Sequence, residues 1–219
     1  PLLFGNSVLW KPSHNSMLSN HLFYEIMLEA GLPQGILNFC PMEGGQFLDI
    51  VAEKDDLGAL LFTGSSQVFD TIHSKIVGNV GGRKTYPRVI GETGGKNFHF
   101  VDESCKDNIY DIVNYTIESA FNYSGQKCSA CSVIYVPEEL LDELITTFQK
   151  NTDYYNNNLQ NYGLINEDAY LRVMEIYNQL ILDEEIKFKV DEGNHLNHEY
   201  FISPKVIVCI KHKNLFFNE

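Results

Sequence analysis

The sequence predicts an α/β protein with parallel strands, and three observations support this fold class. Short apolar runs alternate along the chain with longer stretches in which apolar residues recur at helical spacing. Small residues such as Gly, Ser and Thr follow several of the apolar runs, as they do in strand-to-helix turns. The 219 residues are 44% hydrophobic and 21% charged, which suffices for one or two globular domains. Strands that alternate with helices favour a parallel, doubly wound sheet.

The first part of the chain alternates strand and helix in order. Asn15 or Ser16 can cap the first helix, which Gly31 ends. Within that helix one face is apolar and consists of Leu18, Leu22, Ile26 and Ala30. The expected strands cover residues 7–10, 36–40, 59–63 and 88–91, and two further helices cover about 46–54 and 66–79. The glycine-rich residues 78–82 follow a helix and precede none, so we interpret them as a loop and not as a dinucleotide fingerprint.

The second part of the chain begins a new α/β region at residue 97. A long amphipathic helix is expected over residues 106–122, and a buried strand over 132–136 ends at Pro137. Helices are expected over residues 138–151 and 168–182, with a polar surface loop at 154–158 between them. The last expected strands cover residues 187–190 and 200–210.

The loop around Cys128 is the strongest candidate for chemistry. The preceding helix should end at Gly125, because glycine adopts positive φ without a Cβ clash. Cys128 then lies between a helix end and a strand start, beside Lys127 and two small residues. Small neighbours leave the thiol accessible, and a cation favours the thiolate, which is the reacting species. These conditions are typical of a cysteine nucleophile.

Other interpretations of the cysteine and histidine pattern stay open. A lone cysteine is often a buried packing residue. Cys128 and Cys131 form a CxxC pair, but no second pair completes a zinc site, and a thioredoxin-like motif would open a helix and not a strand. His195 and His198 could share a metal on a helix, but they lie in a Gly/Asn-rich stretch, which argues against that site.

Three polar groups are expected at one edge of the predicted sheet. Lys11, the pair Gly64-Ser65 and Glu92 each follow a strand, and the carboxyl ends of parallel strands lie at the same edge, where ligands bind. The turn at Gly64-Ser65 opens a helix, whose free N–H groups can bind an anion. A plain turn with a serine cap would need no ligand. Glu92 could act as a general base, although a lone Glu is more often a solvated loop residue.

Charge and cysteine content narrow the class of protein. The net charge of −13 disfavours nucleic acid and anionic membranes as partners. Five scattered cysteines do not form a disulfide framework, which favours a reducing compartment. No apolar run is long enough to span a membrane, and the first residues show no targeting segment. The sequence begins and ends in mid-pattern, so we expect an internal piece of a longer protein.

Four motifs, in this order and spacing, resemble the aldehyde dehydrogenase superfamily over nearly the whole chain. The motifs are residues 10–13 (WKPS), 62–65 (FTGS), 92–96 (ETGGK) and 125–130 (GQKCSA). The longer stretches 91–100 and 126–132 resemble the branch that oxidises Δ1-pyrroline-5-carboxylate, the cyclic form of glutamate 5-semialdehyde, with NAD. That resemblance implies proline catabolism to glutamate, a small-molecule aldehyde as substrate, a homo-oligomer and, in eukaryotes, the mitochondrial matrix.

The resemblance also implies roles for particular residues. Cys128 would attack the aldehyde, and Glu92 would activate the water that hydrolyses the resulting thioester. Lys127 and Ser129 would lie near the substrate. The NAD contacts would come from Lys11 and Ser13 at the adenosine ribose and from Gly64 and Ser65 at the pyrophosphate. Residues 1–93 would form part of a Rossmann-like NAD-binding domain, and residues 94–219 part of the catalytic domain.

Two positions depart from the family pattern. Many members carry Glu, which binds the ribose hydroxyls, where this chain has His14. The expected preference for NAD over NADP therefore rests only on the resemblance to this branch of the family. Many also carry Gly where this chain has Phe69, near the pyrophosphate. A dehydrogenase for another aldehyde and a non-catalytic relative of the family therefore remain alternatives.

Overall fold

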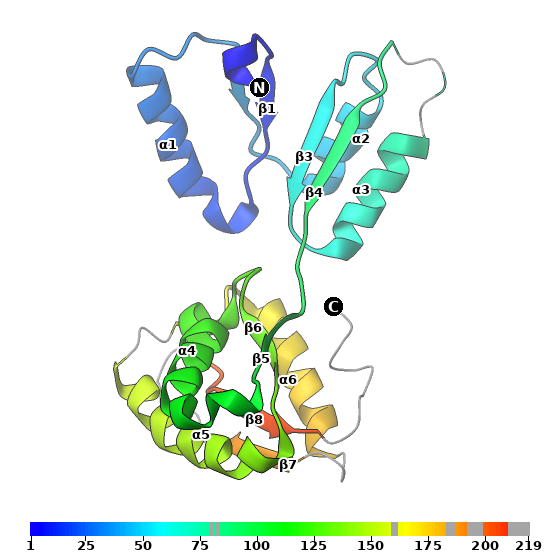
Figure 1. Ribbon diagram of the computed structural model, residues 1–219. Coiled ribbons are helices and arrows are strands. Elements are labelled where there is room, and N and C mark those ends of the chain that lie inside the picture. Colours follow the sequence, from blue (N-terminus) through cyan, green and yellow to red (C-terminus); the bar gives the residue numbers. More distant parts are fainter. Residues whose placement is uncertain (79–80, 82–83, 159–161, 183–186, 192–198, 210–219) are drawn as a thin grey trace. The chain divides into compact units, whose positions relative to one another are not determined.

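The computed structural model describes residues 1–78, 81, 84–158, 162–182, 187–191 and 199–209. These residues form two compact units, Pro1–Thr93 and Gly94–Glu219 (Figure 1). Each unit combines helices with parallel strands, so the predicted α/β class is confirmed. The described strands pair two by two into four small sheets and do not form one continuous sheet.

The first strand pair of unit Pro1–Thr93 is parallel and joined by a helix. Strand β1 (Val8–Trp10) pairs with β2 (Leu37–Phe39), and helix α1 (Met17–Glu29) connects them. Aromatic rings fill the space between helix and strands through the contacts Trp10–Phe23, Trp10–Phe39, His21–Phe39 and Tyr24–Phe39. Ser16 is the residue before the helix, as predicted, but its side chain makes no capping hydrogen bond.

The apolar face predicted on α1 is exposed in the structure. Leu18 is 84% exposed, and Leu22 and Ile26 remain more than half exposed. The reason is geometric, because α1 turns the aromatic side of the helix toward β1 and β2. Periodicity identified the helix correctly but did not identify the face that is buried in this unit.

The second strand pair of this unit carries the turn predicted to bind an anion. Strand β3 (Ala59–Thr63) runs parallel to β4 (Arg88–Glu92), and helix α3 (Ser66–Gly78) crosses between them. Helix α2 (Gly44–Ala52) packs on α3, as Figure 1 shows. The core between them contains Leu48, Ala52, Ile72 and Ile76.

Unit Gly94–Glu219 contains the Cys128 loop. Strands β5 (Asn97–Phe100) and β6 (Cys131–Tyr135) are parallel. They are joined by a short 3-10 turn (Glu103–Asn108) and helix α4 (Ile109–Phe121). Helix α4 packs on α5 (Glu138–Asn158), α6 (Glu167–Ile181) follows, and β7 (Lys187–Asp191) pairs antiparallel with β8 (Lys205–Val208). The core consists of Val101, Ile109, Val113, Ile117, Leu140, Leu144 and Phe148.

Two expectations for this unit differ from the structure. The loop predicted at residues 154–158 is wrong, because α5 continues through Asn158. Asn and Tyr have modest helix propensities, but propensity is a weak prior that helix extension and tertiary context override. The last strand is also shorter than predicted, since β8 covers only Lys205–Val208. The predicted pair His195 and His198 lies outside the described residues.

Candidate functional site

The chain enters the Cys128 loop through an unusual backbone segment. Helix α4 ends at Phe121, and Tyr123, Ser124 and Gly125 then have φ values of 56°, 59° and 70°. Left-handed backbone costs an L-residue energy but costs glycine almost nothing. A Cβ at Gly125 would lie 2.8 Å from the carbonyl oxygen of Ala120. The positive φ predicted for Gly125 is therefore confirmed, and the left-handed turn extends two residues further back.

One side of the loop is tied to the segment before α6. The Gln126 side chain accepts from the Ile165 N–H at 2.9 Å and donates to the Tyr123 carbonyl at 3.1 Å. The Ser124 hydroxyl donates to the carbonyl of Tyr162, and the rings of Tyr123 and Tyr162 stack with centroids 5.7 Å apart. These contacts hold the left-handed turn against a segment about forty residues later in the chain.

The other side of the loop is tied to strand β5. The Asn97 side-chain amide donates to the Cys128 carbonyl at 2.7 Å and to the Ala130 carbonyl at 3.3 Å. One side chain therefore holds the carbonyls of both Cys128 and Ala130. The Cys128 main chain is therefore positioned from both sides while its side chain remains exposed.

The two cysteines of the CxxC pair have different environments. Cys128 is exposed, whereas Cys131 is buried at the start of β6 and donates from Sγ to the Val133 carbonyl at 3.2 Å. Burial raises the pKa of the Cys131 thiol above its ordinary value. All five cysteines are free, and the described residues contain no cluster of side chains that could hold a metal ion. Cys131 leads into a strand, as the sequence predicted.

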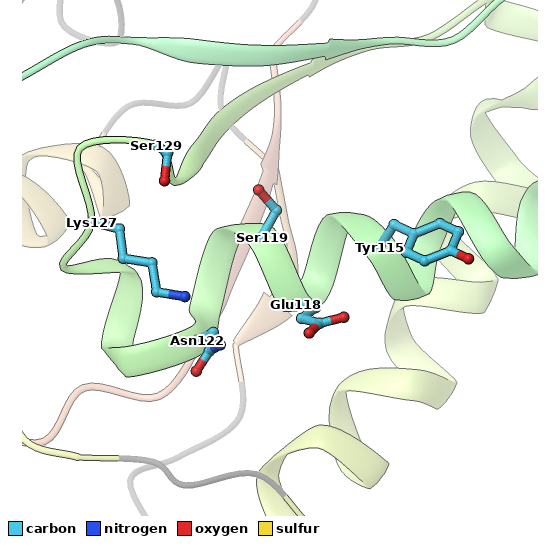
Figure 2. A pocket seen from close by; sticks show the side chains of 6 residues that line it. All are labelled: Tyr115, Glu118, Ser119, Asn122, Lys127 and Ser129. Carbon is cyan, nitrogen blue, oxygen red and sulfur yellow. The ribbon is translucent and has the colours of Figure 1, made fainter.

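A hollow of about 290 Å³ lies next to the loop, and Figure 2 shows its side chains. Lys127 and Ser129, the two residues predicted to lie near the substrate, both line it. The remaining lining residues come from α4 and its C-terminal end: Tyr115, Glu118, Ser119 and Asn122. The Lys127 ammonium lies 5.2 Å from the centroid of the Tyr123 ring, within the range of a cation–π contact.

In unit Pro1–Thr93, the strand pair β3–β4 brings several predicted residues together. Glu92 is the last residue of β4 and pairs with Thr63, and its carbonyl accepts from the Gly64 N–H at 3.1 Å. The Ser65 hydroxyl accepts from the Val68 N–H at 3.3 Å at the start of α3. Gly64, Ser65 and Glu92 therefore share the carboxyl end of this pair, as expected. Lys11 follows β1, which pairs with β2 in a separate sheet, so the described strands do not bring all three groups to one sheet edge. Because Ser65 caps α3 itself, the turn is also complete without a ligand.

The positions that depart from the family pattern are well defined. His14 Nδ1 lies 3.4 Å from a carboxylate oxygen of Glu43, which precedes α2. Lys11 follows β1 as predicted, is partly buried, and donates to the Pro12 carbonyl at 2.6 Å. The Phe69 ring stacks on Phe62, and it fills the space that a Cβ at Gly91 would need. The Phe62 ring in turn lies against Gly64, in the turn that opens α3.

The structure groups the predicted site residues by unit. Gly64, Ser65 and Glu92 meet at one strand pair, and Lys127, Cys128 and Ser129 meet in one loop. Glu92 and Cys128 belong to different units, so a site in which their side chains face each other stays a prediction. Sequence reasoning missed Asn97 and Gln126, whose partners lie far away along the chain. It also missed the α4 residues of the hollow, although their polar spacing at 115, 118, 119 and 122 is visible in the sequence.

The profile of the aldehyde dehydrogenase family matches residues 1–219. The mitochondrial Δ1-pyrroline-5-carboxylate dehydrogenase of Homo sapiens is 45% identical over 144 residues, which covers 66% of this chain and 25% of the human one. The enzyme of that name from Emericella nidulans is 33% identical over 214 residues, which covers 94% of this chain and 37% of that one. The chain thus spans between about a quarter and two-fifths of the length of these relatives.

Solved structures agree with the sequence relatives. A Δ-pyrroline-5-carboxylate dehydrogenase from Mycobacterium tuberculosis matches with a TM-score of 0.84 at 28% identity, over 94% of this chain and 39% of that one. A structure of that enzyme bound with NAD matches with a TM-score of 0.83 at 26% identity, over the same shares. Proline utilization A from Bdellovibrio bacteriovorus matches with a TM-score of 0.88 at 26% identity, over 98% of this chain and 23% of that one. None of the described helices is long and apolar enough to cross a membrane.

Proposed function

The chain belongs to the aldehyde dehydrogenase family, and on that premise we propose that the protein oxidises L-glutamate 5-semialdehyde to L-glutamate with NAD. The relatives named above support this substrate, because they are Δ1-pyrroline-5-carboxylate dehydrogenases and a proline utilization protein. The single observation that carries the proposal is the Cys128 loop, in which an exposed thiol sits on a main chain held from both sides.

Cys128 performs the first step of the proposed reaction. Its sulfur adds to the aldehyde carbon and forms a thiohemiacetal, in which the former carbonyl oxygen carries negative charge. In this proposal the Cys128 N–H stabilises that oxygen, and such backbone donors contribute strongly when they are held rigidly. The hydrogen bond from Asn97 to the Cys128 carbonyl contributes that rigidity. Collapse of the adduct expels hydride and leaves a thioester on the sulfur.

Glu92 performs the second step of the proposed reaction. Its carboxylate removes a proton from water, and the resulting hydroxide attacks the thioester carbon. The acid is released and the Cys128 thiolate is restored. Glu92 is exposed at the end of β4, and Gly94 and Gly95 follow it, which leaves its side chain accessible to water. Covalent capture divides one difficult oxidation into two easier steps.

The cofactor in this proposal is NAD, which supplies the hydride acceptor when bound. Gly64 and Ser65 would contact its pyrophosphate at the start of α3, where helix N–H groups and the helix dipole favour an anion. Lys11 and Ser13 would contact the adenosine ribose. The strand–turn–helix at β3–α3 fits this role, and the Phe62 ring fills the space beside Gly64. The NAD-bound structural neighbour supports the same cofactor.

The remaining parts of the proposal concern the whole protein. We place it in proline catabolism as a homo-oligomer, and its mitochondrial relatives support the mitochondrial matrix as its compartment. The domain assignment is an NAD-binding part at residues 1–93 and a catalytic part at 94–219. Because the chain spans only part of its relatives' length, we expect little dehydrogenase activity from these 219 residues alone.

A pair of variants tests the proposed nucleophile. In a full-length dehydrogenase that carries these residues, Cys128→Ala should abolish aldehyde oxidation, and the matched variant Cys131→Ala should retain turnover because its thiol is buried. An unchanged kcat for Cys128→Ala would remove Cys128 as nucleophile. Two alternatives give other outcomes. A non-catalytic relative would show a Cys128 inert to iodoacetamide at neutral pH, and a dehydrogenase for another substrate would prefer a different aldehyde in a panel of them.

A further inference from the structure

We propose that Glu43 selects NAD over NADP in this chain, because its carboxylate accepts hydrogen bonds from the hydroxyl groups of the adenosine ribose. This inference rests on the proposed function, which places that ribose at Lys11 and Ser13. It assigns a role to a residue that belongs to none of the four sequence motifs and that follows a different strand from the other ribose contacts.

The segments that follow β1 and β2 leave the same end of one sheet. The two strands are parallel, and just beyond β2 the Cys40 N–H still donates to the Trp10 carbonyl at 2.8 Å. Lys11 and Ser13 follow β1, whereas Glu43 follows β2. Because ligands of parallel α/β sheets bind at the carboxyl ends of the strands, Glu43 lies at the edge where the ribose contacts are proposed.

Two contacts bring Glu43 next to the residues that follow β1. One of its carboxylate oxygens lies 3.4 Å from Nδ1 of His14. The Lys11 Cε lies 4.0 Å from the position that a Cβ on Gly44, the residue after Glu43, would occupy. Lys11 and His14 therefore border Glu43 from the neighbouring segment, and a ribose held at Lys11 has the Glu43 carboxylate close by.

The Glu43 carboxylate can accept hydrogen bonds from a ligand. Glu43 is the residue before α2, but its side chain makes no capping hydrogen bond to that helix. The Glu43 side chain is 68% exposed and that of His14 is 79% exposed, so both reach the solvent. A carboxylate has about four lone-pair sites on its two oxygens, so the contact with His14 leaves acceptors for two ribose hydroxyls.

The difference between the two cofactors makes a carboxylate selective. The adenosine ribose of NAD has a free 2′-hydroxyl, which donates to a carboxylate, whereas NADP carries a phosphate there, which a carboxylate repels. Within residues 11–16 and 40–43, all of which the structure describes, Glu43 is the only acidic side chain. Lys11 and His14 are basic and do not repel a phosphate. The preference for NAD therefore depends on Glu43.

Equilibrium binding of the two nucleotides tests this role independently of turnover. In a full-length dehydrogenase that carries these residues, isothermal titration calorimetry should give a lower dissociation constant for NAD than for NADP. Glu43→Gln should reduce the ratio of the NADP constant to the NAD constant about tenfold, because it weakens a charge-assisted hydrogen bond to NAD and removes the repulsion of NADP.

A second carboxylate should restore the selectivity. In the double variant His14→Glu with Glu43→Gln the ratio should recover, because a side chain at position 14 already reaches the Glu43 carboxylate and can present its own at the same place. A purely structural role of Glu43 would not give this recovery.

Glu25→Gln is the matched control. Glu25 is also exposed and lies 3.7 Å from a histidine, His21, but both belong to α1 and not to the segments that follow the strands. This substitution should leave the ratio unchanged.

Three results would overturn Glu43 as the selective residue: a wild type that prefers NADP, an unchanged ratio in a folded Glu43→Gln, or no recovery in the folded double variant. The proposed function fails separately, if the wild type binds NAD selectively but Cys128 forms no adduct with the semialdehyde.

Discussion

Gly125→Ala should strongly destabilise unit Gly94–Glu219. At φ 70° an alanine pays about 1–2 kcal/mol for left-handed backbone. Its Cβ would also lie 2.8 Å from the Ala120 carbonyl oxygen, a backbone atom near the end of α4 that cannot move without distorting the helix. Overpacking of this kind typically costs about 1–3 kcal/mol, so the total expected loss is about 2–5 kcal/mol.

Hydrogen exchange of the α4 amides is the appropriate assay for this loss. The chain's one tryptophan, Trp10, lies in the other unit, so tryptophan fluorescence would report that unit instead. Gly95→Ala is the matched control in the same unit, because its Cβ would meet nothing closer than 3.6 Å and no positive φ is involved. Equal protection of the α4 amides in Gly125→Ala and Gly95→Ala would refute the argument that the left-handed turn requires glycine.

Further predictions concern the reactivity of the loop. Asn97→Ala should slow alkylation of Cys128 by iodoacetamide about fivefold. The substitution removes the 2.7 Å hydrogen bond to the Cys128 carbonyl, which contributes about 1 kcal/mol. An unchanged rate would show that Asn97 does not position the loop. Cys131 should react with iodoacetamide far more slowly than Cys128 at neutral pH, because burial raises the pKa of the Cys131 thiol and leaves less thiolate. The rate at Cys131 should rise only at more alkaline pH. Mass spectrometry of peptides labelled across a pH series measures both rates, and equal rates at neutral pH would contradict this prediction. Gln126→Ala should lower the protection of the Ile165 amide from exchange, because that N–H donates to the Gln126 side chain, and unchanged protection would show that the contact contributes nothing.

Local patterns predicted the elements whose signals are local. The strand Ala59–Thr63 was predicted with its observed bounds, because an apolar run lies between Gly58 and Gly64. The positive φ at Gly125 followed from the chemistry of helix ends. The prediction of a loop at residues 154–158 was wrong, because turn-forming composition does not stop a helix that is already established.

The contacts that shape the Cys128 loop could not be predicted in this way. Asn97 reaches Cys128 across 31 positions, and Gln126 reaches Ile165 across 39. Neither spacing has a periodic signature, since tertiary folding alone brings these residues together. Glu118 is different, because its place in a polar stripe facing away from Val113 and Ile117 can be read from helical periodicity once α4 is recognised.

The identity of the acylated residue tests the central claim most directly. In a full-length dehydrogenase with Glu92→Gln, thioester hydrolysis should become the slow step, so the acyl-enzyme should accumulate when semialdehyde and NAD are supplied. Mass spectrometry of the quenched and digested protein should then find the glutamyl group on the peptide that contains Cys128. An acyl group on another residue, or normal turnover with no acyl-enzyme at all, would contradict the assignment of Cys128 and Glu92.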